Sequence, residues 1–188
     1  MNKSRLEAFS DSVIAIIITI MVLELHIPES ADWHALLELL PNFSSYILSF
    51  IYLAIYWNNH HYMIHAATRV TAGVLWANLH LLFWLSLIPF ATGWMGRHHL
   101  EAVPSATYGA VLFMAGFAYW ILQQQVMRAA GPHSRIAQAI GRDAKGLISV
   151  ALYAAAIAFA FVNQWVSDAV YAGVAMIWLV PDRRLKPS

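Results

Sequence analysis

The chain has 188 residues, of which 60% are hydrophobic and only 11% are charged, and its mean hydropathy is +0.58. A soluble domain carries about 25% charged residues, so this chain has too few charges to cover a water-facing surface. Its formal net charge of +1 gives no reason to expect a nucleic-acid partner, and the lack of cysteine excludes disulfides, thiolate nucleophiles and zinc–sulfur sites.

The apolar residues come in successive blocks of roughly 20, the length that a helix needs to cross a bilayer. We therefore expect an all-α integral membrane protein with six spans in a single domain, residues 1–188. The expected spans are about 4–26, 42–64, 71–95, 105–127, 144–162 and 166–180. A short amphipathic piece at 33–40 is expected to lie at the membrane interface. Pro89 is expected to kink the third span, and Gly131-Pro132 to end the fourth.

The N-terminal segment superficially resembles a signal peptide, because Lys3 and Arg5 precede the apolar run 13–23. No small-x-small cleavage site follows that run, so we interpret it as a retained first span.

The positive charges predict an orientation, because Lys and Arg gather in cytoplasmic loops. With six spans and the N-terminus inside, ten of the eleven positive charges fall on the cytoplasmic side. These are Lys3, Arg5, Arg69, Arg128, Arg135, Arg142, Lys145, Arg183, Arg184 and Lys186, and only Arg97 falls outside. Both termini are therefore expected in the cytoplasm. The tryptophans near the expected span ends fit the interfacial belt: Trp33, Trp57, Trp94, Trp165 and Trp178.

Asp11 is an ionisable residue inside the first span, where an unpaired charge is costly. At a rise of ~1.5 Å per residue it lies on the order of 10 Å from the cytoplasmic end. Asn78 and His80 reach a similar depth on the third span, so a hydrogen-bonded cluster of these three residues is expected from depth alone. The alternative is that Asp11 is solvated among the lipid headgroups.

The rest of the first span carries a stripe of two hydroxyls and three aliphatic side chains. Helical spacing places Ser12, Ile16, Thr19, Ile20 and Leu23 on this stripe. It could serve ordinary helix packing, since the opposite face is equally apolar. Alternatively, copies of the helix from several subunits could surround an axis, with an apolar constriction and hydroxyl oxygens facing a passing ion.

Histidines at the end of the second span include a pair at i, i+4, His61 and His65, which is a spacing that can hold a metal. No acidic third ligand lies in the segment, so interfacial histidines are the favoured interpretation and no metal or cofactor is expected. The phosphate-loop, nucleophile-elbow and H-E-x-x-H motifs are missing, and no enzymatic activity is expected.

The sequence becomes recognisable at Arg5-Leu-Glu-Ala-Phe9-Ser10-Asp11. This string resembles the R-x-x-x-F-S-D signature of the endolysosomal potassium channel family, transmembrane protein 175, and is most similar to its prokaryotic members. The likeness extends to Tyr56-Trp57-x-x-His60-His61 and to the segment from Asn78-Leu-His80 to Pro89-Phe90. These motifs cover the first half of the chain.

The resemblance implies a homotetramer of six-helix subunits in the plasma membrane of a prokaryote, with a central pore lined by the first helix. Carried over by distance from the motif, the constriction falls on Ile16, followed outward by Ile20 and Leu23. The selectivity-related hydroxyl falls on Thr19. The stripe itself, apart from the resemblance, offers Ser12 as a second oxygen for the ion. A structural network holding the pore helix falls on the following residues: Arg5, Phe9, Ser10, Asp11, Asn78 and His80.

These inferences predict a potassium-selective channel that conducts K⁺ passively, with identical subunits and lipid as its partners. Two alternatives remain open. One is a small transporter or proton-leak pathway in which Asp11 and His80 titrate. The other is a haem- or metal-binding redox protein that uses His60, His61, His65 and His80.

Overall fold

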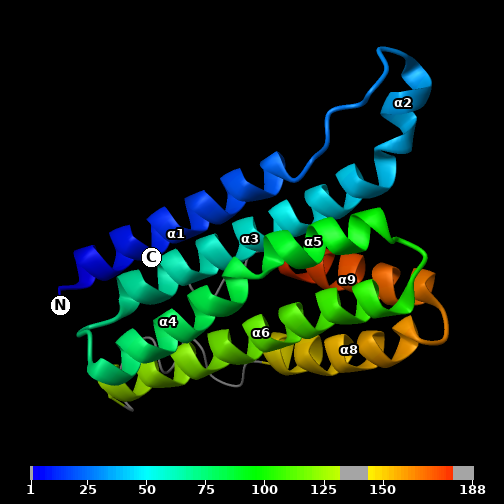
Figure 1. Ribbon diagram of the computed structural model, residues 1–188. Coiled ribbons are helices and arrows are strands. Elements are labelled where there is room, and N and C mark those ends of the chain that lie inside the picture. The colour runs from blue at the N-terminus through cyan, green and yellow to red at the C-terminus, as the bar shows by residue number, and fades with distance from the viewer. Residues whose placement is uncertain (1, 132–143, 180–188) are drawn as a thin grey trace.

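The computed structural model describes residues 2–131 and 144–179, and every regular element within these ranges is a helix (Figure 1). The helices are α1 Lys3–Leu23, α2 Trp33–Glu38, α3 Leu40–Ala66, α4 Ala72–Ser86, α5 Ile88–Arg97, α6 Ala102–Ala130, α8 Ala144–Ala160 and α9 Gln164–Leu179. The all-α class predicted from the sequence is confirmed.

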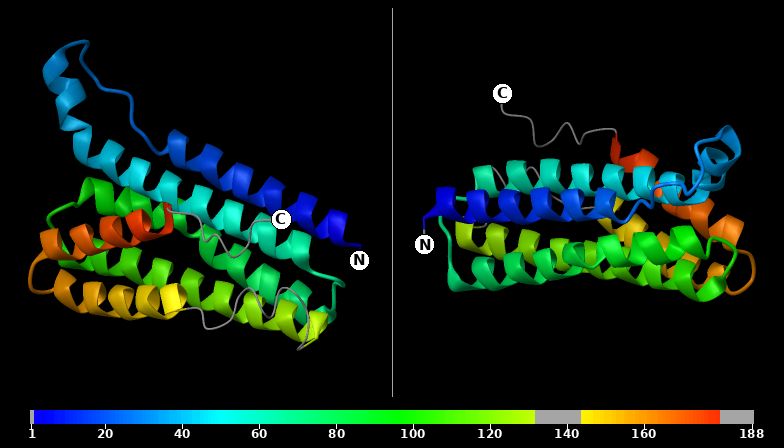
Figure 2. Two further views of the ribbon diagram at one scale, coloured as in Figure 1. Left: turned by 180° about the vertical axis from the view of Figure 1, so that it is seen from behind. Right: turned by 45° about the horizontal axis from the view of Figure 1, so that its top comes forward.

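The long helices form one bundle in which successive rods run in opposite directions, with α4 and α5 joined end to end (Figures 1 and 2). Helix α6 packs along both α4 and α8, and α3 packs along α5. Helix α1 packs against α3, α4 and α5 and lies at the outside of the bundle (Figure 2). One side of α1 therefore faces away from its own chain.

Local signals in the sequence set several helix ends. The side chains of Asn2 and Thr71 accept hydrogen bonds from the first turns of α1 and α4. Helix α6 ends at Gly131, whose φ of +90° lies in a region that L side chains rarely adopt. Helix α4 ends at Ser86, and Pro89 stands in the first turn of α5. The kink expected at Pro89 is confirmed, and it takes the form of an interruption between α4 and α5 at Leu87.

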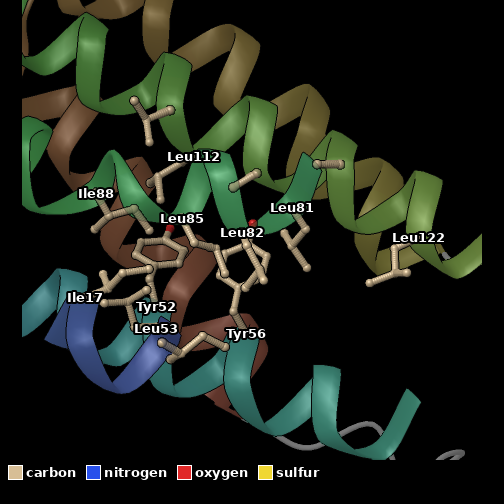
Figure 3. Packing of buried hydrophobic residues seen from close by; sticks show 14 of the residues in the cluster. Ile17, Tyr52, Leu53, Tyr56, Leu81, Leu82, Leu85, Ile88, Leu112 and Leu122 are labelled. Carbon is tan, nitrogen blue, oxygen red and sulfur yellow. The ribbon is translucent and has the colours of Figure 1, made fainter. Parts of the chain in front are cut away.

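The apolar core lies where α1, α3, α4, α5 and α6 meet. Figure 3 shows Ile17 beside Leu53 and Tyr52, facing Leu85 and Ile88. All five side chains are buried. Close packing of this kind fixes the rotation of each helix about its own axis.

Buried hydroxyls tie the bundle together inside the core. The Ser49 hydroxyl lies 2.9 Å from the Tyr108 hydroxyl and accepts a 2.7 Å hydrogen bond from Thr92. The Tyr52 hydroxyl donates to the Tyr171 carbonyl at 2.6 Å. These bonds link α3, α5, α6 and α9 and satisfy polar groups internally, as an apolar surrounding requires.

Within residues 2–131 and 144–179, three helical segments are long and apolar enough to cross a membrane: Lys3–Leu23, Ala72–Arg97 and Ala102–Ala130. Lys145–Ala160 is apolar but shorter. The expected count of six spans and their orientation stay predictions. Some of their supporting residues lie outside the described ranges, namely Pro132, Arg135, Arg142, Val180, Arg183, Arg184 and Lys186.

Candidate functional site

Helix α1 has two apolar faces with different surroundings. One face is buried against the bundle at a spacing of three or four residues: Leu6, Ser10, Ile14, Ile17 and Met21. The other face is exposed and contains the predicted stripe: Ser12, Ile16, Thr19, Ile20 and Leu23. Ile16 is 58% exposed and Leu23 is 76% exposed. The structure thus brings all five stripe residues to one open face of the protomer.

The two hydroxyls on the exposed face are held by their own helix. Ser12 Oγ donates to the Ala8 carbonyl at 2.7 Å, and Thr19 Oγ1 donates to the Ala15 carbonyl at 2.9 Å. Because each hydroxyl hydrogen is used within the helix, the oxygen lone pairs stay available to an external partner. Such an oxygen can accept a hydrogen bond from water or contact a cation.

The buried face of α1 is anchored by a polar chain. Asn78 Nδ2 donates to Ser10 Oγ at 3.0 Å, and His60 Nε2 lies 2.7 Å from Asn78 Oδ1. Since the Asn78 amide oxygen can only accept, His60 Nε2 carries the proton in this pair. All three side chains are buried. Helices α1, α3 and α4 are therefore joined by a continuous hydrogen-bonded link.

Asp11 and His80 have tryptophan partners instead of the expected mutual cluster with Asn78. Trp57 Nε1 donates to Asp11 Oδ1 at 3.0 Å. Trp84 Nε1 donates to His80 Nε2 at 2.9 Å, one turn along the same helix. The structure thus brings Ser10 and Asn78 together. Asp11 and His80 are each hydrogen-bonded to a tryptophan and not to one another.

Two further residues of the predicted network lie on the exposed side of α1. Arg5 is exposed, and its backbone N–H donates to Asn2 Oδ1 at 2.9 Å. Phe9 is also largely exposed. Within one protomer, neither side chain lies in the buried link.

Sequence reasoning missed Trp57 as the partner of Asp11 on α1, and His60 as the partner of Asn78 on α4. Both stand in the Tyr56-Trp57-x-x-His60-His61 string, whose place at the end of a span predicts an interfacial tryptophan beside clustered histidines. Whether Trp57 can reach Asp11, and His60 can reach Asn78, depends on how α3 is rotated about its own axis. The signal that could have indicated them is that α1 and α3 are both rich in polar groups at matching depth.

The remaining histidines of α3 lie at the end where α1 begins. His61 Nδ1 lies 2.9 Å from Glu7 Oε1, and the His61 and His65 rings stack at 6.0 Å. Lys3 Nζ donates to the His65 carbonyl. Over residues 2–131 and 144–179, no three His, Cys, Asp or Glu side chains come together as a metal site would require.

Comparison with known proteins places these features in a family context. The model of the family described as endosomal/lysosomal potassium channel TMEM175 matches residues 5–89. A potassium channel from Chryseobacterium sp. (strain P1-3) is 50% identical over 188 residues, which is 100% of this chain and 98% of the relative. A potassium channel from Streptomyces collinus is 32% identical over 137 residues, covering 68% of this chain and 66% of the relative.

A solved structure is also similar over almost the whole chain. It is the crystal structure of a lysosomal potassium-selective channel TMEM175 homolog from Chamaesiphon minutus. The TM-score is 0.85 at 25% sequence identity, and the match covers 96% of this chain and 98% of the other. The likeness therefore includes the helices that follow the matched motifs.

Proposed function

We propose that this chain, which belongs to the TMEM175 family of potassium channels, is one subunit of a homotetrameric channel that conducts K⁺ passively through a central pore. The pore is lined by the exposed face of α1. Ile16, Ile20 and Leu23 form its apolar constriction, and Thr19 and Ser12 supply oxygen atoms to the ion. The protein is a channel and not an enzyme.

The observation that carries the proposal is the low burial of α1. Its apolar window is only 28% buried, compared with 50% for Ala72–Arg97 and 56% for Ala102–Ala130. Large exposed apolar faces mark surfaces that another molecule covers. Lipid alone would cover such a face, but lipid gives no reason for Ser12 and Thr19 to share it with aliphatic residues. Four copies around an axis account for both kinds of side chain.

An aliphatic ring favours potassium for a physical reason. Isoleucine side chains cannot replace the water around an ion, so the ion that loses water at lower cost passes more easily. This favours K⁺ over Na⁺. Replacing Ile16 by Asn supplies polar atoms at the narrow point, and we expect the K⁺/Na⁺ permeability ratio to fall. An unchanged ratio in Ile16→Asn would contradict the selectivity mechanism.

The topology completes the proposal. The helices cross the plasma membrane of a prokaryote six times, with both termini in the cytoplasm, as the distribution of Lys and Arg favours. Lys3 lies beside the end of α3, and Arg69 Nε donates to the Ala129 carbonyl at the end of α6. Arg97 lies at the opposite end, next to Glu24. Cysteine-accessibility labelling at Ser4 and at His99 tests the two sides.

The test of conduction is recording from the purified protein in planar bilayers under K⁺/Na⁺ bi-ionic conditions. We compare the wild type with Ile16→Ala and with Ile148→Ala, an isoleucine on α8 that is 54% exposed and so matches Ile16 in exposure. We expect a K⁺-selective unitary current that changes in Ile16→Ala and not in Ile148→Ala. Equal effects of both substitutions would remove α1 from the pore.

A transporter or proton pathway gives a different result in the same preparation. It would show a saturable flux without unitary events, and Asp11→Asn and His80→Gln would abolish that flux. Both residues already have tryptophan partners in the protomer, which suits a structural role.

A further inference from the structure

The start of α1 is held against the end of α3 by two polar contacts (Figure 1). Lys3 Nζ donates to the His65 carbonyl, and His61 Nδ1 lies 2.9 Å from Glu7 Oε1. The side chains of His61 and Glu7 are 42% and 22% exposed. A proton can therefore reach this pair from water while both partners stay in contact with the bundle. We refer to the Glu7–His61 pair as the α1 clasp.

An aromatic column on α3 holds the imidazole of the clasp in place. The His61 ring stacks between two neighbours, Trp57 at a centroid distance of 6.2 Å and His65 at 6.0 Å. Trp57 Nε1 in turn donates to Asp11 Oδ1 at 3.0 Å. The three rings are four residues apart along α3 and so share one face of the helix. Stacking on both sides therefore fixes the direction in which His61 meets Glu7.

The clasp lies on the side of α1 that points away from the exposed stripe. Glu7 comes nine residues before Ile16, which is about two and a half turns at 3.6 residues per turn. Glu7 is half-buried beside α3, whereas Ile16 is largely exposed. A change at the clasp can therefore alter how firmly α1 is held without adding an atom to the exposed stripe.

Three histidines stand at this end of α3, and His61 is the one beside a carboxylate. His60 is buried, where a charge is costly. His65 has the Lys3 ammonium at its own carbonyl, and a positive charge disfavours a second one close to it. A proton taken up by this group of rings is therefore held best at His61, next to Glu7.

The charged groups on the other helices that pack against α3 lie farther away. Within the described residues, α5 and α9 carry Arg97 and Asp168, and both are at the opposite end of the bundle. Arg128 is in the last turn of α6, and Arg69 Nε donates to a carbonyl at the end of that helix. The carboxylates of Glu7 and Asp11 are thus the acidic groups nearest the imidazole.

We propose that the α1 clasp is a proton-operated contact, which fixes the start of the pore helix to α3 when His61 is protonated. Protonation converts a hydrogen bond from a neutral ring into an ion pair with the Glu7 carboxylate, and charge on both partners strengthens such a bond. The added stability is therefore present at low pH and is lost as the pH rises and His61 gives up its proton.

The effect on conduction rests on the proposed function. The apolar window of α1 is only 28% buried, so few contacts within the protomer hold this helix. The proposed topology places the start of α1 in the cytoplasm. Acidification of that side would then hold the pore helix more firmly and change the current. The clasp itself is formed within one protomer and does not depend on conduction.

The experiment is hydrogen exchange of the purified protein in lipid nanodiscs at pH 5.5 and pH 8.0, corrected for intrinsic rates. These values bracket the range in which histidine side chains usually titrate. For the amides of residues 5–11, we expect protection in the wild type to be about threefold greater at pH 5.5, as suits a partly exposed ion pair. Glu7→Gln should abolish the difference. Equal protection at both pH values in the wild type, or an undiminished difference in Glu7→Gln, would overturn the proposal.

The matched control is Glu101→Gln, which removes the charge from the His98–Glu101 pair at the other end of the bundle. Its residues 5–11 should keep the wild-type pH dependence. A loss of that dependence in Glu101→Gln would show that the effect is not local to the clasp, and the proposal would fail.

His61→Lys places a permanent positive charge opposite Glu7. Its residues 5–11 should be protected to the same degree at both pH values, whereas a wild-type pH dependence would assign the effect to another group. Bilayer recording with the pH changed only on the side where α1 begins should show a current that responds to pH in the wild type and not in His61→Lys. Exchange needs no current, so a silent protein with the expected protection would contradict the proposed function alone.

Discussion

Helices α1 and α6 are both long and apolar, but α6 buries most of its apolar window within the chain, whereas α1 leaves most of its window exposed. Helix α6 lies between α4 and α8, and 56% of its apolar window is buried within the chain. Helix α1 buries 28% of a window that is more apolar still. The difference shows that hydropathy indicates how strongly a helix avoids water. The buried fraction indicates whether its own chain or another molecule packs against its apolar side chains. For α1 the cover must come largely from outside the protomer.

The largest effect should come from disturbing the close approach of α6 to its neighbours. A Cβ at Gly109 would overlap the Tyr171 hydroxyl and come within 2.7 Å of its Cζ and 2.9 Å of Ile157 Cγ1. Overpacking of a buried site costs about 1–3 kcal/mol and sometimes more. We expect Gly109→Val to lose most of the folded protein, as measured by thermal unfolding in detergent.

Gly173→Ala is the control for that substitution, because open space surrounds the position on α9. Its melting temperature should equal or slightly exceed that of the wild type, since alanine is the better helix former. Similar losses at both glycines would show that α6 is not packed more tightly than α9.

The next effect compares the two faces of α1 at adjacent isoleucines. Ile17 is buried in the core and Ile16 is largely exposed. Ile17→Ala leaves a cavity and should destabilise the protomer by about 2–4 kcal/mol. Ile16→Ala should change stability by less than about 1 kcal/mol and should instead alter conduction. Thermal unfolding and bilayer recording on the same preparations separate the two outcomes, and a larger stability loss in Ile16→Ala would invert our assignment of the faces.

A smaller effect distinguishes Ser10 from Ser12, which lie on opposite faces of α1. Ser10→Ala removes the acceptor of Asn78 Nδ2 in a buried site, which costs about 1–3 kcal/mol because the amide is left without a partner. Ser12→Ala removes a bond only to the same helix, and the expected change in stability is within about 0.5 kcal/mol. The measurement is again the unfolding midpoint. Equal values for the two variants would mean that the buried link does not hold α1.

The smallest effect concerns α2, which has no buried residue and depends on its cap. The Ala35 N–H donates to Asp32 Oδ1 at 2.8 Å, and this bond lowers the pKa of the Asp32 carboxyl. A lowered pKa means that the cap is fully effective at neutral pH and is lost as the pH falls through that lowered value. Hydrogen exchange at Ala35, corrected for intrinsic rates, should accelerate in Asp32→Ala at neutral pH. Asp32→Asn should retain protection both at neutral pH and below the lowered pKa of Asp32. Equal protection in the wild type, Asp32→Ala and Asp32→Asn would exclude a capping role.

Much of the fold was predictable because its causes are local. Low charge and blocks of apolar residues indicate membrane helices wherever they occur. The end of α6 at Gly131 and the break near Pro89 follow from the backbone preferences of single residues. The stripe from Ser12 to Leu23 follows from helical spacing, and the R-x-x-x-F-S-D string identifies the family without any contact being known.

The sequence by itself determined which residues share a depth and which share a face of one helix, because the rise and turn of an α-helix are fixed. Only the tertiary structure decided how each helix is rotated toward its neighbours. Asn78 could be placed at the level of Asp11 from the sequence, but its partners proved to be Ser10 and His60. Both faces of α1 are apolar, so periodicity could not distinguish them. That choice was made by long-range packing and by buried hydrogen bonds between helices that are distant in the chain.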